Sequence, residues 1–219
     1  LCTFAFHFYS YQSYMINIIL ITITVIISIL SFQRQDVFSR LSFNAYAVVH
    51  QRQWYRVLTY GFIHANWMHL FINMFVLWTF GELLEDTYVY IFDQKGHIMY
   101  VLLYLTAIVI STMFDLKQYK DNYNYQAVGA SGATSAVVFA FIMLYPMESI
   151  YLFFILIGIP AFIFAILFLI YSMYMAKKNM DNIGHTAHFY GAVYGFFFVL
   201  LFDYKLIIRF FLQVVEFFS

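Results

Sequence analysis

Long apolar runs separated by short polar segments dominate the chain. A helix needs about 20 predominantly apolar residues to cross the hydrocarbon core of a bilayer, and the runs approach or exceed this length. The pattern therefore predicts an all-α fold, a polytopic membrane protein with six transmembrane helices. The predicted spans are residues 14–32, 57–80, 98–114, 128–145, 150–176 and 186–202.

The segments between and after the apolar runs predict the domain organisation. Residues 33–56 mix charged and aromatic side chains, which is typical of a segment at the membrane interface. Residues 203–219 are predicted to form an amphipathic tail. We find no internal repeat or linker, and we expect a single membrane domain over residues 1–219, with a six-helix core at about 14–202.

Two further segments carry specific expectations. Residues 82–95 contain several charges, so we expect a connection that faces water. The run 150–176 is free of charge and longer than a bilayer requires, so we expect a tilt or a kink at Gly158 to Pro160.

Composition narrows the class of protein. Hydrophobic residues make up 64% of the 219 residues and charged residues only 10%, whereas soluble domains carry about 25% charged residues. The formal net charge is zero, so we expect no nucleic-acid partner, and the lipid bilayer is the expected environment. Cys2 is the only cysteine, so an intrachain disulfide and a thiolate metal site are both excluded.

Candidate reactive side chains lie at one level of the predicted bundle. The second, fourth and sixth spans run in the same direction, so their first turns approach the same membrane surface. Polar groups inside spans are costly and usually face the bundle interior or a wet cavity. The residues are His64, Asn66, His69 and Asn73 in the second span, Ser131 in the fourth, and His185 and His188 in the sixth.

Ser131 opens the fourth span between Gly129 and Gly132. The first amides of a helix are unpaired, so a hydroxyl group there lies beside donors that can bind an oxyanion. Glycines leave room for a substrate carbonyl group to approach. A serine nucleophile also needs a base, which a histidine of the same layer can supply.

The spacing in the second span adds candidate oxyanion donors. Asn66 is a predicted N-cap with His69 three residues later, and His69 and Asn73 share one helix face. Their side chains can complete an oxyanion hole beside Ser131. His64 precedes the cap and need not share that face.

Two other interpretations of the same residues stay open. Small residues at close spacing commonly let membrane helices touch, and polar groups can simply bond helices together. Four histidines could also bind a metal, although no His-Glu-x-x-His helix is present and no carboxylate lies near them in sequence.

Three segments resemble motifs of the rhomboid intramembrane serine proteases, each at the beginning of an even-numbered span. They resemble the family's His-x4-His-x3-Asn, Gly-x-Ser-Gly and Ala-His-x2-Gly-x3-Gly motifs, in that order. In this sequence they are His64 to Asn73, Gly129 to Gly132 and Ala187 to Gly195, within a resemblance over residues 52–202. A lone Gly-x-Ser-Gly is a weak signal, but the ordered set is specific.

The resemblance implies a role for each matching residue. Ser131 would be the nucleophile and His188 the general base, a dyad without an acidic member. His69 and Asn73 would line the oxyanion hole with the Ser131 amide. Supporting residues would be Gly129, Gly132, His64 and Arg56, the last two structural or holding water, and Glu85 would be a helix-end anchor away from the chemistry.

The sequence also departs from the family pattern. An aromatic residue often follows the nucleophile by four positions and stacks under the base, but this position is Ser135 here. Ser135 or Tyr190 is a candidate for orienting His188 instead. His185 has no role in the resemblance and is expected to be a polar residue at a helix start.

The resemblance implies a six-helix rhomboid-like bundle that cleaves transmembrane protein substrates at or near the membrane surface, without a cofactor or a metal. The alternative is a catalytically inactive relative that binds membrane clients. Eight of the eleven Lys and Arg residues lie on the expected catalytic face, which would place that face in the cytoplasm. The family layout favours a multi-pass protein of the cell (plasma) membrane with the site facing outward, and this is the orientation that we expect.

Overall fold

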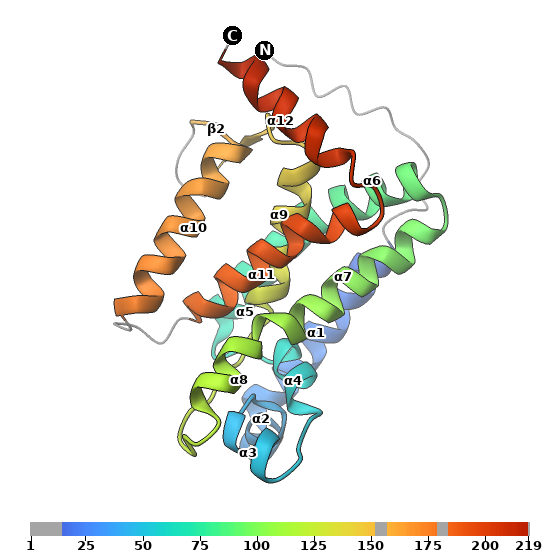
Figure 1. Cartoon of the computed structure of the whole chain (residues 1–219). Helices are drawn as coiled ribbons and strands as arrows, with labels where there is room; N and C mark the ends of the chain where they lie inside the picture. The colour runs from blue at the N-terminus through green and yellow to red at the C-terminus, as the bar shows by residue number, and fades with distance from the viewer. Residues whose placement is uncertain (1–14, 152–156, 179–183, 219) are drawn as a thin grey trace.

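The structure is a computed structural model that describes residues 15–151, 157–178 and 184–218. Figure 1 shows a helical bundle in which α9 (Ser131–Leu144) lies centrally and α11 (His185–Phe198) runs across it. In the described part of the chain, four helical segments are long and apolar enough to span a membrane. They are Met15–Gln33, Trp67–Phe92, Lys95–Tyr119 and Ala161–Lys178. The prediction of an all-α, polytopic membrane protein is confirmed.

Short helices connect or extend these segments, and two short strands precede α10. The helices in chain order are α1 (Met15–Gln33), α2 (Gln35–Leu41), α3 (Ala45–His50), α4 (Arg56–Thr59), η1 (Tyr60–Phe62), α5 (Trp67–Val76), η2 (Leu77–Gly81), α6 (Glu82–Phe92), α7 (Lys95–Ser111), α8 (Met113–Tyr119), α9, α10 (Ala161–Lys178), α11, η3 (Val199–Leu201) and α12 (Leu206–Phe217). Strands β1 (Ser149–Ile150) and β2 (Ile159–Pro160) pair antiparallel.

The tightest helix packing joins α9 to α11. A methyl group added at Gly191 would overlap the carbonyl oxygen of Gly132, and one added at Gly195 would overlap that of Ala136. The two glycines are one turn apart on one helix face, so the two backbones touch over at least that turn. Gly191 and Gly195 therefore form the close-packing face of α11, which fixes the register between the two helices.

The second span differs from its predicted bounds of 57–80. It begins at Trp67, after the short helices α4 and η1, and continues through α6 to Phe92. The segment 82–95 is therefore mostly helix rather than a water-facing connection. The charges misled the interpretation because one of them, Glu85, is fully buried.

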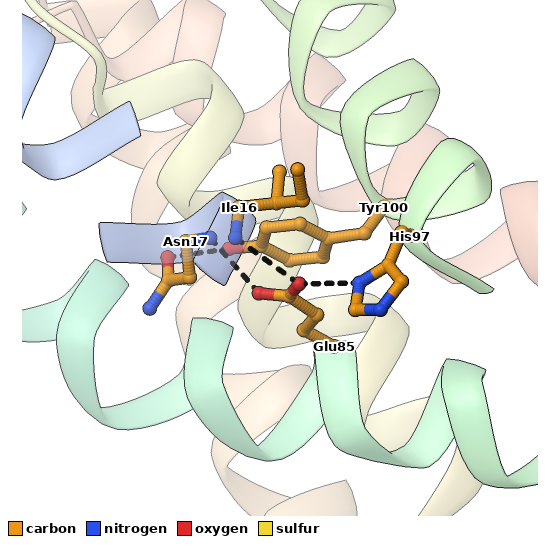
Figure 2. Close-up of polar contacts among 5 residues, drawn as sticks. All are labelled: Ile16, Asn17, Glu85, His97 and Tyr100. Carbon is orange, nitrogen blue, oxygen red and sulfur yellow. Dashed lines mark hydrogen bonds and ion pairs between the residues drawn. The ribbon is translucent and has the colours of Figure 1, made fainter. Parts of the chain in front are cut away.

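Glu85 binds the beginning of α1, as Figure 2 shows. Its carboxylate accepts hydrogen bonds from the amides of Ile16 (3.3 Å) and Asn17 (2.9 Å) and pairs with Nδ1 of His97 at 2.7 Å. The unpaired amides of a helix N-terminus favour an anionic acceptor, which explains how this carboxylate is kept inside the bundle. Glu85 is thus the helix-end anchor that the resemblance implied.

Asn17 explains the π-helical turn η2 that separates α5 from α6. Its Nδ2 donates to the carbonyl oxygen of Leu77 at 3.1 Å, and its Oδ1 accepts from the hydroxyl group of Tyr100 at 2.7 Å. A Cβ at Gly81 would collide with both partners of this second bond. A side chain that donates a hydrogen bond to a carbonyl oxygen of the helix competes with the helical hydrogen bond, and the turn widens locally.

We expect Glu85→Ala to lower the free energy of unfolding by about 3 kcal/mol, because buried donors of α1 and α7 lose their acceptor. Glu85→Gln, which keeps one acceptor oxygen, should lose less. The matched control is Glu82→Ala on the same helix, where the side chain is partly exposed, and its effect should stay within about 0.5 kcal/mol. Unfolding in detergent micelles measures all three, and equal stability of Glu85→Ala and wild type would contradict the anchor.

The fifth span is also shorter than predicted. Residues 152–156 of the expected run 150–176 lie outside the described residues, and α10 begins at Ala161, directly after Pro160. Proline lacks an amide hydrogen and suits the position before or at the first turn of a helix. Pro160 therefore marks the beginning of a helix rather than a kink inside one.

Candidate functional site

Ser131 is the first residue of α9 and the only partly exposed one in its first thirteen residues. All twelve residues from Gly132 to Met143 are buried. The helix is therefore accessible only at its two ends, and Ser131 is the accessible residue at the N-terminal end. The amides of this end are not used by preceding turns of helix, so they remain available as donors.

The loop before Ser131 is held by backbone hydrogen bonds. The amide of Gly129 donates to the carbonyl oxygen of Tyr60 at 3.0 Å, and Phe43 and Ala127 exchange backbone hydrogen bonds of 2.9 and 3.1 Å. Gly129 has a φ of 121°, a conformation that side chains with a Cβ rarely adopt. The loop therefore reaches Ser131 along one fixed path.

His69 lies against this loop. A Cβ at Gly129 would be 2.5 Å from Cε1 and 2.8 Å from Nε2 of the His69 ring. The glycine is thus required twice, for its positive φ and for the space that the imidazole occupies. The arrangement brings His69 beside the backbone two residues before Ser131.

His64 is hydrogen-bonded to the same loop. Its Nε2 accepts a hydrogen bond from the amide of Ala130 at 3.4 Å, and its Nδ1 lies 2.9 Å from Oγ of Ser28. Because Nε2 accepts, the neutral ring carries its proton on Nδ1 and donates to Ser28, which in turn donates to the carbonyl oxygen of Phe62 at 3.1 Å. His64 is fully buried and structural, and it ties α1 to the Ser131 loop.

Asn66 and Asn73 have the local roles predicted from their spacing. The Asn66 side chain caps α5 by accepting from the amide of His69 at 2.9 Å. Nδ2 of Asn73 donates to the His69 carbonyl oxygen at 2.9 Å, and Oδ1 accepts from the hydroxyl group of Thr134 on α9 at 3.1 Å. Asn73 therefore links His69 to the serine helix, and one of its two amide protons is left for another acceptor.

The register between α9 and α11 places His188 at the level of Ser131. A Cβ at Gly132 would be 3.3 Å from the carbonyl oxygen of Ala187, so the residue after Ser131 faces the residue before His188. His188, like Ser131 and His69, is only partly buried. The motifs of three helices thus converge at one end of the α9–α11 contact.

Tyr190, one of the two candidates for orienting His188, stacks on Phe114 with ring centroids 5.4 Å apart. Instead, the ring of Phe168 on α10 lies beside that of His188, with centroids 6.3 Å apart and planes at 30°. Sequence reasoning missed Phe168, because nothing in an apolar run marks which side chain will meet a distant histidine.

His185 begins α11, as expected of a polar residue at a helix start. It is 4% exposed, and its ring lies 5.9 Å from that of His188 and 5.6 Å from that of Tyr171, edge-on to both. In the described part of the chain, no group of three His, Cys, Asp or Glu residues is arranged to hold a metal ion.

Arg56 stabilises the segment that includes α2 and α3. Its Nη1 donates to the carbonyl oxygens of Ser39 (2.7 Å) and Ser42 (2.6 Å), and its Nε donates to Oε1 of Gln53 at 2.6 Å. The guanidinium group borders a cavity of about 150 Å³, which residues of α3 and of the loop before α9 also line. Its contacts are structural.

Comparison with known proteins identifies the family of the chain. The Rhomboid domain model matches residues 51–205, which include every motif residue of the site. A segment of 33 residues is 52% identical to Rhomboid-like protein 11, chloroplastic, of Arabidopsis thaliana, and it covers 15% of this chain and 12% of that protein. Since the family model covers more than half of the chain, this protein belongs to the rhomboid family.

Proposed function

We propose that the protein is an intramembrane serine endopeptidase that hydrolyses peptide bonds of transmembrane protein substrates. The observation that carries the proposal is the accessibility of Ser131, which begins α9 and is partly exposed, whereas the next twelve residues are buried. A structural serine needs no access from outside the helix bundle, whereas a nucleophile must be reached by a carbonyl carbon.

Ser131 and His188 divide the chemistry between them in this proposal. Oγ of Ser131 attacks the substrate carbonyl carbon while His188 takes the hydroxyl proton. The same proton passes to the leaving amine as the peptide bond breaks, which leaves an acyl-enzyme and a free amino terminus. A water molecule then loses a proton to His188 and attacks the ester, releasing the new carboxyl terminus and restoring the Ser131 hydroxyl group.

The negative charge that develops on the carbonyl oxygen needs donors that are already in place. The amide of Ser131 is one candidate, since it belongs to the first turn of α9. His69 lies against Gly129, and Asn73 keeps one amide proton beyond its bond to His69. These three groups are the proposed oxyanion hole.

The lengths of the two motif helices support cleavage below the membrane surface. α9 and α11 each have 14 residues, so each is about 21 Å long, shorter than the hydrocarbon core of about 30 Å. Their first turns can therefore lie inside the membrane. A substrate helix must unwind there to expose a peptide bond, because an intact helix hides its amides.

A fluorophosphonate probe, which reacts with activated serines, tests the proposal on the purified chain in detergent. We expect labelling of the folded protein and none after heat unfolding, with the modification located on Ser131 by peptide mass spectrometry. Labelling of a different serine, or an unlabelled folded protein, would overturn the proposal, and the second result would favour an inactive binder of membrane clients.

The same probe tests the proposed orientation. We propose that the site opens to the outer face of the cell membrane, although eight Lys and Arg residues lie on that side. A membrane-impermeant fluorophosphonate should then label Ser131 in intact cells as well as in broken ones. Labelling only after the cells are broken would place the catalytic face inside.

A further inference from the structure

The aromatic environment of His188 comes from a different helix. Ser135 follows Ser131 by one turn of α9 and is buried, and its short side chain presents no ring to the base. The nearby ring belongs to Phe168 in the middle of α10, and its plane is inclined by 30° to that of His188. The centroid separation of 6.3 Å lies within the range of favourable aromatic pairs.

The Phe168 ring is itself held on two further sides. Phe139 of α9 lies 5.5 Å away and Phe164, one turn earlier on α10, lies 5.7 Å away, both measured between ring centroids. These rings belong to the apolar cluster that packs α9, α10 and α11 together. Phe168 therefore occupies one defined position in that cluster.

This position also limits the rotation of the base. The backbone of α11 is fixed against α9 at Gly191 and Gly195, so the remaining freedom of His188 is that of its side-chain torsions. A ring held by neighbours on α9 and α10 limits those torsions on one side, and His185 lies edge-on at 5.9 Å on another. Both contacts leave the His188 ring partly exposed.

We infer that Phe168 is a positioning residue for the general base, and that α10 thereby contributes to catalysis without touching the substrate. The inference rests on the proposed function. Its consequence is specific: the orientation of His188 depends on the seating of α10 against α9 and α11. A change at Phe168 should lower the rate of the chemical step while leaving the binding of a small reactant unchanged.

The test compares the labelling kinetics of Phe168→Leu and wild type with the fluorophosphonate probe. Leucine keeps an apolar side chain in the cluster, so the fold should tolerate it. We expect the maximal rate of labelling to fall about tenfold, because a misplaced base loses its alignment with the hydroxyl group. The probe concentration at half-maximal rate should not change, and Phe168→Tyr, which retains the ring, should label at the wild-type rate.

Phe162→Leu is the matched control, since it removes from the same helix a ring that packs on Phe217 rather than on Phe168 or His188. It should label at the wild-type rate, and thermal unfolding in micelles measures the stability of both leucine variants. An unchanged maximal rate in Phe168→Leu, or an equal fall in Phe162→Leu, would overturn the inference. An unlabelled wild type would instead refute the proposed function, so the two failures are distinguishable.

Discussion

Ser131→Ala is expected to reduce cleavage of a single-span reporter protein by about 10⁴-fold or more, because the substrate then has no nucleophile to attack it. His188→Ala should cause a loss of similar size, since an unassisted hydroxyl group is a weak nucleophile. The measurement is the rate of appearance of the cleaved reporter in proteoliposomes. Family resemblance suggests a reporter with small side chains near one end of its transmembrane segment.

The double variant distinguishes a dyad from two independent contributions. Residues that act as one catalytic unit are strongly non-additive, so Ser131→Ala/His188→Ala should be no slower than either single variant. Additive losses would mean that the two residues do not act on the same proton transfer. Cleavage by Ser131→Ala at the wild-type rate would remove the serine from the mechanism altogether.

Two matched control variants show whether a loss of cleavage comes from the missing catalytic group or from unfolding of the protein. Ser135→Ala removes a buried hydroxyl group one turn further along α9, and it should leave cleavage within a few fold of wild type. His50→Ala removes an exposed imidazole that pairs with Asp121 at 3.1 Å, and such surface pairs contribute little. A large loss of cleavage in Ser135→Ala with the fold intact would mean that Ser135 orients His188, and a loss accompanied by unfolding would mean that changes in α9 disrupt the fold.

Much of the site could be predicted because its signals are local. An N-cap, a pair of residues one turn apart and a serine between glycines are all encoded within a few positions, and the structure has Asn66, His69 and Asn73 in the predicted relations. The direction of successive spans then suffices to bring the motif residues to one level. The contact that Gly191 and Gly195 make with α9 is predictable for the same reason, because two glycines four residues apart share one helix face.

The errors have a common physical origin in partners that are distant in sequence. Charges at 82–95 indicated water, but Glu85 is bound by the amides of α1, nearly seventy residues earlier. The ring beside His188 comes from α10, and no periodicity distinguishes Phe168 from the other apolar residues of that helix. Such pairings depend on how helices pack, which a single sequence encodes only indirectly.

Gly191→Ala should reduce the rate of fluorophosphonate labelling by about 10²-fold and destabilise the fold by about 1–3 kcal/mol. The new methyl group would overlap the carbonyl oxygen of Gly132, which is backbone and cannot rotate away. α11 must then shift relative to α9, and His188 moves with it. A displacement of about 1 Å at a catalytic group is sufficient for a loss of this size.

Gly184→Ala is the matched control at the other end of the same helix segment. Among the described residues, a Cβ there would meet only the Ala187 Cβ at 3.7 Å, and the backbone has an ordinary φ of −73°. Its labelling rate should equal that of wild type, with a loss of stability of at most about 1 kcal/mol, because Gly184 is the N-cap of α11 and alanine is less favourable there. Thermal unfolding and labelling kinetics in the same micelles separate stability from alignment.

Gly195→Ala separates these two effects further. It creates the same kind of overlap, with the carbonyl oxygen of Ala136, but one turn farther from the base. The two variants should therefore lose similar stability, while Gly191→Ala loses more of the labelling rate of its folded fraction. Equal labelling losses would mean that α11 moves as a rigid body, and wild-type labelling by Gly191→Ala would show that the register of α9 and α11 does not set the alignment of Ser131 with His188.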